Sequence, residues 1–223
     1  MTSPAHADGA AAADLVISAA AAWQAAHPGV LVLAIDGHGA AGKSTIAGAV
    51  ADATAAALVH TDDFFRPASS VTGGAARRSP GIPALACYYD WRRIKQRALE
   101  PLRAGRGATF RRFDWERGSG LGRKVTVDPS LLVLLEGVFS AAPEFSGLVD
   151  RSVLVDTPKL VRLRRLHARV TPEEWDDDWL AAEQAYFDTT RPPSSFDLVV
   201  PGVSSDAAHP AGPGDDPPEP PAT

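Results

Sequence analysis

A glycine loop between an apolar run and an alanine-rich segment constrains this chain more than any other feature. The loop spans residues 37–45 and reads G-H-G-A-A-G-K-S-T, which fits the pattern G-x-x-x-x-G-K-[ST]. The apolar run 30–35 before it indicates a β-strand, and the segment 46–57 after it indicates a helix. A strand, such a loop and a helix in this order are typical of a phosphate-binding loop. The sequence therefore predicts an α/β domain that binds a phosphate-bearing ligand.

Each residue type in this loop has a physical role in holding a nucleoside triphosphate. Glycines let backbone N–H groups converge on phosphate oxygens, and the helix N-terminus adds partial positive charge. We expect Lys43 to reach the terminal phosphates and act in catalysis, and the Ser44 hydroxyl to ligate Mg²⁺. The residues predicted to bind ATP are Gly37, Gly39, Ala40, Ala41, Gly42, Lys43, Ser44 and Thr45.

The same glycines also fit G-x-G-x-x-G, the pattern of dinucleotide-binding folds. Asp62 follows at about the 20-residue spacing at which such folds place a ribose-binding acid. That interpretation would make the protein an NAD-dependent dehydrogenase, but it gives Lys43 and Ser44 no role. Because the mononucleotide interpretation uses every residue of the motif, we favour it and keep the dehydrogenase as an alternative.

Hydrophobic patterns along the chain predict a three-layer α/β/α fold with a mostly parallel five-stranded sheet. The predicted strands are 30–35, 57–60, 131–135, 152–155 and 196–200. The predicted helices are 10–26, 46–54, 90–102, 158–169 and 172–188. Two short strands, 109–115 and 123–127, are expected to pair with each other. Together with the glycine loop, these elements predict a P-loop NTPase fold.

Composition marks the ends of the folded part of the chain. We expect a flexible lead over residues 1–9, one folded domain over 10–200 and a disordered, proline-rich tail over 201–223. The segment 66–84 is rich in Pro, Gly, Ser and Ala and indicates a mobile loop.

Charge and cysteine content narrow the classes of function. A net charge of −5, from 22 basic and 27 acidic residues, argues against general binding to nucleic acid or a membrane surface. The single cysteine excludes an intramolecular disulfide. The sequence shows neither a basic leader nor an apolar stretch of membrane-spanning length, so we expect a cytoplasmic protein. Homo-oligomer formation is left open.

Carboxylates follow two of the predicted strands. Asp62 and Asp63 come directly after strand 57–60, and ligands of parallel α/β sheets bind at the carboxyl ends of the strands. One of the two is expected to face the loop and act as the base toward an acceptor hydroxyl, an Asx turn being the alternative. Glu136 closes the apolar strand 131–135, where a carboxylate needs a cation or donors. We expect Glu136 to serve Mg²⁺ together with Ser44.

Arginines recur on one face of the predicted helix 158–169. Arg162, Arg165 and Arg169 have the spacing i, i+3, i+7. Facing the phosphates, Arg162 and Arg165 would neutralise charge that develops during phosphoryl transfer, and Arg169 would contact the substrate. A solvated basic face is the alternative. His38, inside the loop, is expected to be exposed and without a catalytic role.

Taken together, these residues resemble the uridine kinase-like family of P-loop kinases, which includes nicotinamide riboside kinase, over about residues 30–200. The segment 61–67, T-D-D-F-F-R-P, is similar to the family's D-x-F-[YF] segment, whose first aspartate is the general base. This resemblance assigns that role to Asp62. The segment 134–137, L-L-E-G, is similar to the family's L-[FIL]-E-G, whose glutamate serves the Mg²⁺ site.

Two further segments carry the resemblance. The segment 88–91, Y-Y-D-W, is similar to the one that holds ribose hydroxyls in the family, which implies contacts from Asp90 and Tyr89. The V-D-T at 155–157, followed by the arginine-rich helix, is similar to the family's approach to its lid, which is short here.

The resemblance implies a kinase with ATP and Mg²⁺ as cofactors and a small-molecule hydroxyl, best the 5′-hydroxyl of a nucleoside, as acceptor. The segment 113–118, F-D-W-E-R-G, has Phe where pyrimidine-specific relatives have Tyr, and it lacks their His, so the base is left open. A kinase for a pantothenate-, sugar- or cyclitol-like alcohol, and a nucleotide-binding regulator without phosphotransfer, are the alternatives. The expected substrate-binding residues are Asp62, Phe65, Tyr89, Asp90, Arg112, Trp115 and Arg169.

Overall fold

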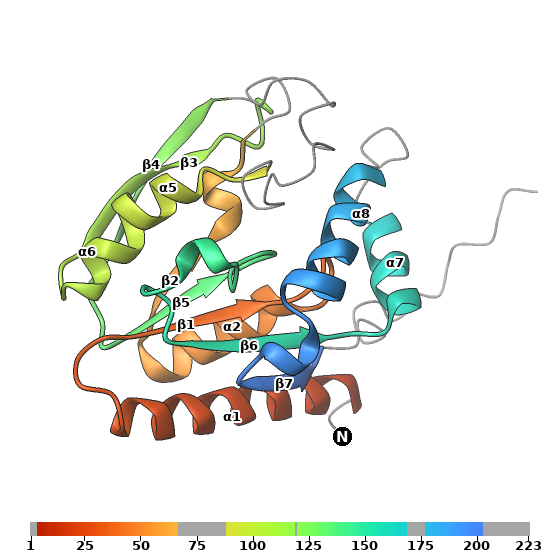
Figure 1. The fold of residues 1–223 in the computed structure, drawn as a ribbon, viewed down its shortest axis with the longest axis horizontal. Coiled ribbons are helices and arrows are strands. Elements are labelled where there is room, and N and C mark those ends of the chain that lie inside the picture. The colour runs from red at the N-terminus through yellow and green to blue at the C-terminus, as the bar shows by residue number, and fades with distance from the viewer. Residues whose placement is uncertain (1–3, 67–87, 119, 169–176, 203–223) are drawn as a thin grey trace, which may run out of the picture.

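Five parallel strands form the centre of the molecule. The computed structural model describes residues 4–66, 88–118, 120–168 and 177–202. The strands are β1 (Leu31–Asp36), β2 (Ala57–His60), β5 (Leu132–Glu136), β6 (Arg151–Asp156) and β7 (Leu198–Pro201). They lie in the order β2-β5-β1-β6-β7, and every neighbouring pair is parallel. The predicted five-stranded sheet is thereby confirmed, and all its carboxyl ends meet at one edge (Figure 1).

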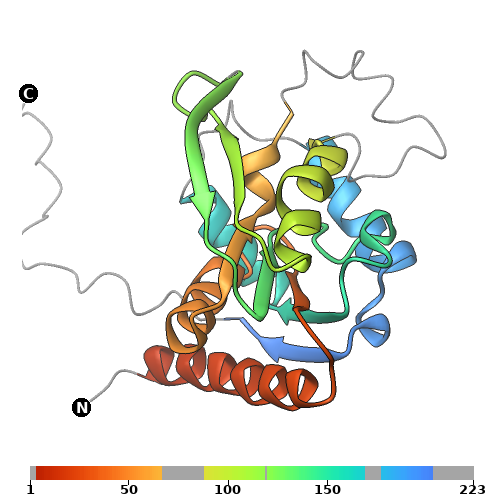
Figure 2. The same ribbon diagram turned by 90° about the vertical axis from the view of Figure 1, so that its left-hand side faces the viewer.

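Helices cover both faces of this sheet. The α-helices are α1 (Pro4–Ala25), α2 (Lys43–Thr54), α5 (Trp91–Ile94), α6 (Glu100–Arg103), α7 (Lys159–His167) and α8 (Asp177–Ala185). Helices α1 and α2 pack on one face, whereas α5 and α6, joined by a π-helical turn at Lys95–Leu99, pack on the other (Figures 1 and 2). Helices α7 and α8 lie beside each other beyond the carboxyl end of β6. The three-layer architecture is therefore as predicted.

A small hairpin stands apart from the central sheet. Its strands β3 (Ala108–Phe113) and β4 (Leu121–Val127) are antiparallel and form the pair that the sequence predicts. Figure 2 shows this hairpin above the level of the sheet. The remaining short elements are the 3-10 helices η1 (Thr61–Phe64), η4 (Pro143–Phe145) and η7 (Pro193–Ser195) and the π-helix η6 (Tyr186–Thr190).

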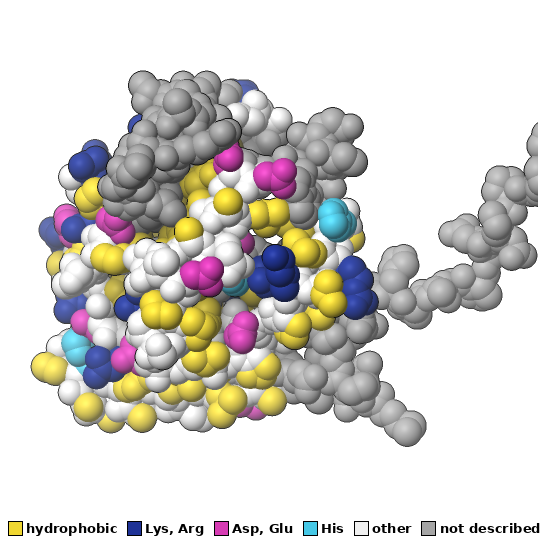
Figure 3. Space-filling model, turned by 45° about the vertical axis from the view of Figure 1, so that its right-hand side comes forward, with side chains coloured by type: hydrophobic (Ala, Val, Ile, Leu, Met, Phe, Trp, Pro, Cys, Tyr) yellow, Lys and Arg dark blue, Asp and Glu magenta, His cyan; other side chains and the backbone are white. Residues whose placement is uncertain are grey.

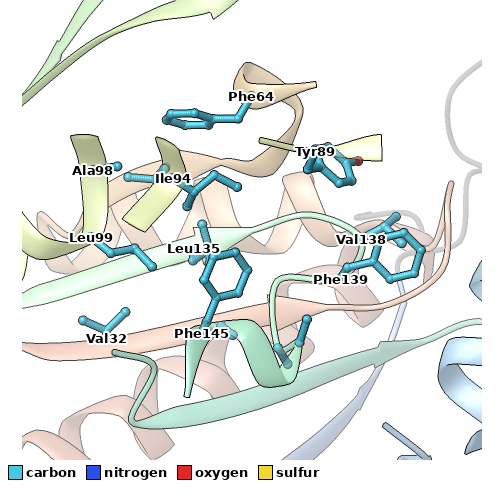
Figure 4. Close-up of a cluster of buried hydrophobic side chains, with 14 of the residues drawn as sticks. Val32, Phe64, Tyr89, Ile94, Ala98, Leu99, Leu135, Val138, Phe139 and Phe145 are labelled. Carbon is cyan, nitrogen blue, oxygen red and sulfur yellow. The ribbon is translucent and has the colours of Figure 1, made fainter. Parts of the chain in front are cut away.

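The strand β1 supplies side chains to two hydrophobic cores. Leu31, Leu33 and Ile35 belong to the core under α1 and α2, whereas Val32 and Ala34 belong to the core under α5. Successive side chains of a strand point to opposite faces, so a strand buried on both faces is continuously apolar. Figure 4 shows the second core, in which side chains of the sheet meet those of η1, the α5–α6 helix and η4.

Several boundaries differ from the sequence predictions. Helix α1 begins at Pro4, inside the segment expected to be a flexible lead, because an alanine-rich sequence favours helix and proline is tolerated in a first turn. Strand β7 ends at Pro201, inside the segment expected to be a tail. The predicted loop 66–84, apart from Arg66, lies outside the described residues, as do the first residues of the predicted helix 172–188.

Within the described part of the chain, no helix is both long enough and apolar enough to cross a membrane. On the face shown in Figure 3, acidic, basic and hydrophobic side chains are interspersed over the described surface.

Candidate functional site

The glycine loop connects β1 to α2 at the carboxyl edge of the sheet. Gly42 is the N-cap of α2 and has a φ of 101°, in the left-handed region that favours glycine. Gly37 has a φ of 148°, and a Cβ atom there would lie 2.5 Å from the carbonyl oxygen of Val155. The loop therefore packs directly on β6, and glycine is required at both positions. Its backbone N–H groups precede a helix N-terminus, the arrangement that binds phosphate.

Asp36, the last residue of β1, anchors the start of the loop. Its carboxylate accepts hydrogen bonds from the backbone N–H groups of Gly37 (2.7 Å), Phe139 (2.9 Å) and Ala141 (2.9 Å) and from the Tyr186 hydroxyl (2.8 Å). Complete burial raises the pKa of Asp36, while the hydrogen bonds from Ala141, Gly37 and Tyr186 oppose that rise. Sequence reasoning missed this residue, although it closes an apolar strand as Glu136 does.

Ser44 and Glu136 form a hydrogen-bonded pair next to the loop. The Ser44 hydroxyl donates to Glu136 Oε1 at 3.0 Å, and Nδ1 of His60 lies 2.7 Å from Oε2. Burial raises the pKa of Glu136, but the bond with His60 and the charge of Lys43 outweigh it, so that the pKa is lowered. Glu136 is therefore ionised at neutral pH and connects β5, the loop and the end of β2.

This pair fits a magnesium site. Hydroxyl and carboxylate oxygens are hard ligands of the kind that Mg²⁺ takes, and Mg²⁺ commonly uses one or two protein oxygens together with substrate phosphates. No cluster of three or more His, Cys, Asp or Glu side chains suited to a metal occurs among the described residues. Ser44 and Glu136 would thus hold Mg²⁺ with a bound phosphate completing its ligand shell.

Asp62 lies in η1, directly after β2. Its Oδ1 accepts a hydrogen bond from the Tyr89 hydroxyl at 2.8 Å. Part of the residue is exposed, yet its carboxylate is surrounded closely enough that desolvation raises its pKa. The Tyr89 bond and the charge of Lys43 lower this pKa, whereas the charge of Glu136 raises it. Asp62 is therefore near both the loop lysine and the proposed metal ligand.

The neighbouring carboxylate has different surroundings. Asp63 is buried, and its Oδ1 lies 3.0 Å from Nε of Arg112 on the hairpin. Burial raises the pKa of Asp63, and the Arg112 guanidinium opposes that rise. Arg112, predicted to bind substrate, thus forms an ion pair with Asp63 that joins the hairpin to η1.

Aromatic rings form a surface that is linked to Asp62 through Tyr89, whose ring lies 5.9 Å from that of Phe65. The rings of Phe65 and Trp115 lie 4.8 Å apart, as do those of Phe113 and Trp115. Trp115 is 57% exposed, whereas Tyr89 is buried. Asp90, predicted to bind substrate, caps helix α5, because its side chain accepts a hydrogen bond from the Arg93 N–H at 3.1 Å. A flat ligand group could therefore stack on Trp115.

Helix α7 turns two arginines toward the loop. Nε of Arg162 donates to the carbonyl oxygen of Thr157 at 3.0 Å, and Nη1 of Arg165 donates to the carbonyl oxygen of Ala40 at 3.0 Å. Both side chains are buried, so they do not form the solvated basic face that was the alternative. Arg169, predicted to bind substrate, lies outside the described residues.

Glu183 of α8 contacts the loop and was not predicted. Its Oε1 accepts a hydrogen bond from the Gly39 N–H at 3.0 Å, and its Oε2 lies 3.3 Å from Nδ1 of His38. The expectation of an exposed His38 is wrong, because its ring packs against Phe187 at 4.3 Å. No local sequence pattern indicates this contact, which joins residues 144 positions apart.

Comparisons with known proteins show what this fold is similar to. The sequence matches no protein-family model and no curated protein. A solved structure of a candidate uridine kinase from Bacillus stearothermophilus matches with a TM-score of 0.61 and 23% identity, over 85% of this chain and 97% of that one. A candidate fructose transport system kinase from Silicibacter sp. TM1040 matches with a TM-score of 0.54 and 22% identity, over 78% and 91%. At this identity the likeness establishes the fold, which is the α/β fold of P-loop NTPases.

The strand order distinguishes this fold from a dinucleotide-binding one. Dinucleotide-binding sheets have the order 3-2-1-4-5-6, in which the second strand lies next to the first. Here β5 lies between β1 and β2. The topology therefore contradicts the dehydrogenase alternative that the glycine spacing alone left open.

Proposed function

We propose that this protein is an ATP-dependent kinase that transfers the γ-phosphoryl group to a hydroxyl of a small molecule, preferably the 5′-hydroxyl of a nucleoside. One observation carries the proposal: Lys43 and Ser44 of the glycine loop, Glu136 at the end of β5 and Asp62 directly after β2 meet at one edge of the parallel sheet, where Ser44 donates a hydrogen bond to Glu136. A base, a phosphate-binding cation and a metal-binding carboxylate are the parts that phosphoryl transfer to an alcohol requires. Because such an enzyme consumes ATP, we propose a cytoplasmic location, without a nucleic-acid or membrane partner.

The loop side of the site would hold the triphosphate. The loop amides and the Lys43 ammonium would bind the phosphate oxygens, and Ser44 and Glu136 would hold Mg²⁺. Bound Mg²⁺ would neutralise charge on the phosphates. Arg162 and Arg165 lie on the loop side of α7, where a guanidinium can stabilise charge that accumulates during transfer.

The other side would prepare the acceptor. As the acceptor oxygen bonds to the γ-phosphorus, its proton passes to the Asp62 carboxylate, and the bond to ADP breaks with its electron pair remaining on ADP. Burial raises the pKa of Tyr89 well above its ordinary value, so its hydroxyl stays protonated and can donate to Asp62. Tyr89 thereby holds the base in position, and most of the rate gain would come from this positioning.

The aromatic surface favours a nucleoside. Trp115 is exposed, and its ring lies against that of Phe65. Phe65 is three residues after Asp62 in the chain. A nucleobase is flat and stacks on aromatic rings, with each stacked base contributing about 1–3 kcal/mol. We therefore expect the base to contact Trp115 while the sugar hydroxyl meets Asp62.

A non-nucleoside alcohol is the second candidate. Phe113 has neither the hydroxyl nor the imidazole with which a protein would read a pyrimidine edge, so the ring surface alone would not distinguish a base from another flat or apolar group. One fold relative is described as a candidate fructose transport system kinase, which makes a sugar the first such acceptor to test.

A coupled assay of ADP release tests the proposal. The purified protein is supplied with MgATP and, in separate reactions, with nucleosides, sugars, cyclitols and pantothenate. Nucleoside-dependent ADP release supports the proposed function, and release with only a sugar, cyclitol or pantothenate supports the second candidate. ATP binding without release for any acceptor would instead indicate a nucleotide-binding regulator.

A further inference from the structure

A buried carboxylate occupies part of the phosphate loop. Glu183 is 1% exposed, and its Oε1 accepts the Gly39 N–H at 3.0 Å. A Cβ atom at position 39 would lie 3.1 Å from the same oxygen, so the glycine gives the carboxylate room to approach the backbone. Backbone N–H groups of such a loop bind the oxygens of an anion. In this structure, one of those N–H groups binds an oxygen of the protein's own side chain.

Other donors of the loop are also engaged by the protein itself. The Lys43 ammonium donates to the carbonyl oxygen of His38 at 2.8 Å, within the same loop. His38 in turn lies against the second oxygen of Glu183 at 3.3 Å. Two of the groups that would contact a triphosphate, the Gly39 N–H and the Lys43 ammonium, therefore bind oxygens of the protein itself.

The surroundings of Glu183 allow its side chain to move. Its charge interacts with the guanidinium of Arg162. A cavity of about 380 Å³ lies between α7 and α8 and is bordered by His38, Lys159, Arg162, Glu183 and Gln184. Its basic groups offer a displaced carboxylate favourable partners, and the space is large enough for it. The side chain can thus leave the loop without becoming an unpaired buried charge.

We propose that Glu183 is an internal competitor for the phosphate loop, which binds the Gly39 N–H in the ligand-free protein and must withdraw when a triphosphate binds. This inference rests on the proposed function, because it concerns the same loop. Two negative groups, a carboxylate and a phosphate, repel each other at this distance and compete for one donor. Glu183 therefore lowers nucleotide affinity and couples nucleotide binding to the position of α8.

Calorimetric titration of a charge-neutral variant tests the inference. Glu183→Gln keeps the size and an acceptor oxygen but removes the charge, so MgATP and inorganic pyrophosphate are each expected to bind about tenfold more tightly than to the wild type. Glu183→Asp, which retracts the charge from the loop, is expected to shift affinity in the same direction by a smaller factor. Glu100→Gln, on an exposed position of α6, removes one charge elsewhere and is expected to leave affinity unchanged.

The outcomes separate this inference from the proposed function. If the wild type binds both ligands and Glu183→Gln binds them equally or more weakly, Glu183 is a structural clamp and the inference is overturned. If neither protein binds either ligand, the inference and the proposed function both fail. Thermal unfolding of each variant identifies any that does not fold, and the remaining variant at position 183 then decides the matter.

Discussion

Asp62 and Asp63 are neighbours in the chain, but their carboxylates have different partners. The short helix η1 turns the first carboxylate to Tyr89 and toward the charge of Lys43, and it turns the second to Arg112 on the hairpin. Asp63 therefore holds two elements together, whereas Asp62 remains partly open to solvent beside the loop. The pattern of two adjacent aspartates after a strand predicts that one faces the site, and Asp62, which is not held in an ion pair with the hairpin, stays the predicted one.

Replacing Asp62 with Asn is predicted to remove turnover but not nucleotide binding. The amide keeps the size of the side chain but cannot accept the acceptor's proton, and general-base catalysis typically contributes about 10²–10⁴-fold. ADP release is therefore expected to fall by at least about 10²-fold, while the dissociation constant of MgATP changes little. Asp52→Asn, on an exposed position of α2, is the matched control. Full activity of the Asp62 variant would remove this residue from the mechanism.

Removing the Tyr89 hydroxyl is predicted to change how the rate depends on pH. Desolvation raises the pKa of Asp62 and the Tyr89 bond lowers it. A base with a raised pKa loses activity as the pH falls through that pKa, so the acid limb of kcat/KM should lie above the ordinary range of aspartate. Tyr89→Phe removes a donor that favours the ionised form, so the acid limb should move to higher pH.

The profile of kcat/KM against pH, measured for both proteins, checks this shift. Tyr186→Phe removes a hydroxyl that donates to Asp36 rather than to Asp62 and should leave the acid limb in place. An acid limb that stays still or moves to lower pH in Tyr89→Phe would show that Tyr89 does not act through Asp62.

At the scale of elements, Asp36 joins three parts of the fold at the start of the loop. It ends β1, it accepts two N–H groups from the segment after β5, and it accepts the hydroxyl of Tyr186 from η6. These bonds connect the end of β1 and the first residue of the loop to the segment after β5 and to η6. The loop is therefore held by its neighbours in the sheet as well as by its own glycines.

Replacing Asp36 with Ala is predicted to destabilise the protein. The substitution leaves four buried donors without an acceptor, and each such group costs about 1–3 kcal/mol, so the free energy of unfolding should fall by at least about 4 kcal/mol. Tyr186→Phe removes one donor only and should cost about 1 kcal/mol. Urea denaturation followed by circular dichroism measures both changes. Equal stabilities for Asp36→Ala and the wild type would show that this junction does not hold the loop.

Local patterns predict most elements but not the contacts between them. The strands and the glycine loop are predictable because apolar runs and glycine spacing are properties of neighbouring residues, and the loop 37–45, the sheet and the hairpin are found where expected. The contacts of Glu183 and His60 could not be predicted, because each residue is far from its partner in the sequence and only the fold brings the two together. Glu183 reaches Gly39 from 144 residues away, and His60 reaches Glu136 from 76 residues away. Roles assigned to Asp62, Asp90 and Trp115 stay predictions, since they depend on a ligand.

At the scale of the whole molecule, the parallel sheet brings the candidate site together. Because all five strands point the same way, the loop after β1, Asp62 after β2 and Glu136 at the end of β5 meet at one edge. Strand β5 lies between β1 and β2 and places Glu136 between the loop and Asp62. This order excludes the dinucleotide-binding topology and agrees with the α/β fold of P-loop NTPases.

A calorimetric titration with MgATP tests the central claim most directly, since every proposed role requires a nucleoside triphosphate in this loop. The account predicts saturable binding by the wild type and loss of that binding in Lys43→Ala, which removes the ammonium from the loop, with NAD giving no heat to either protein. The absence of binding to the wild type at millimolar MgATP, or unchanged binding to Lys43→Ala, would contradict it.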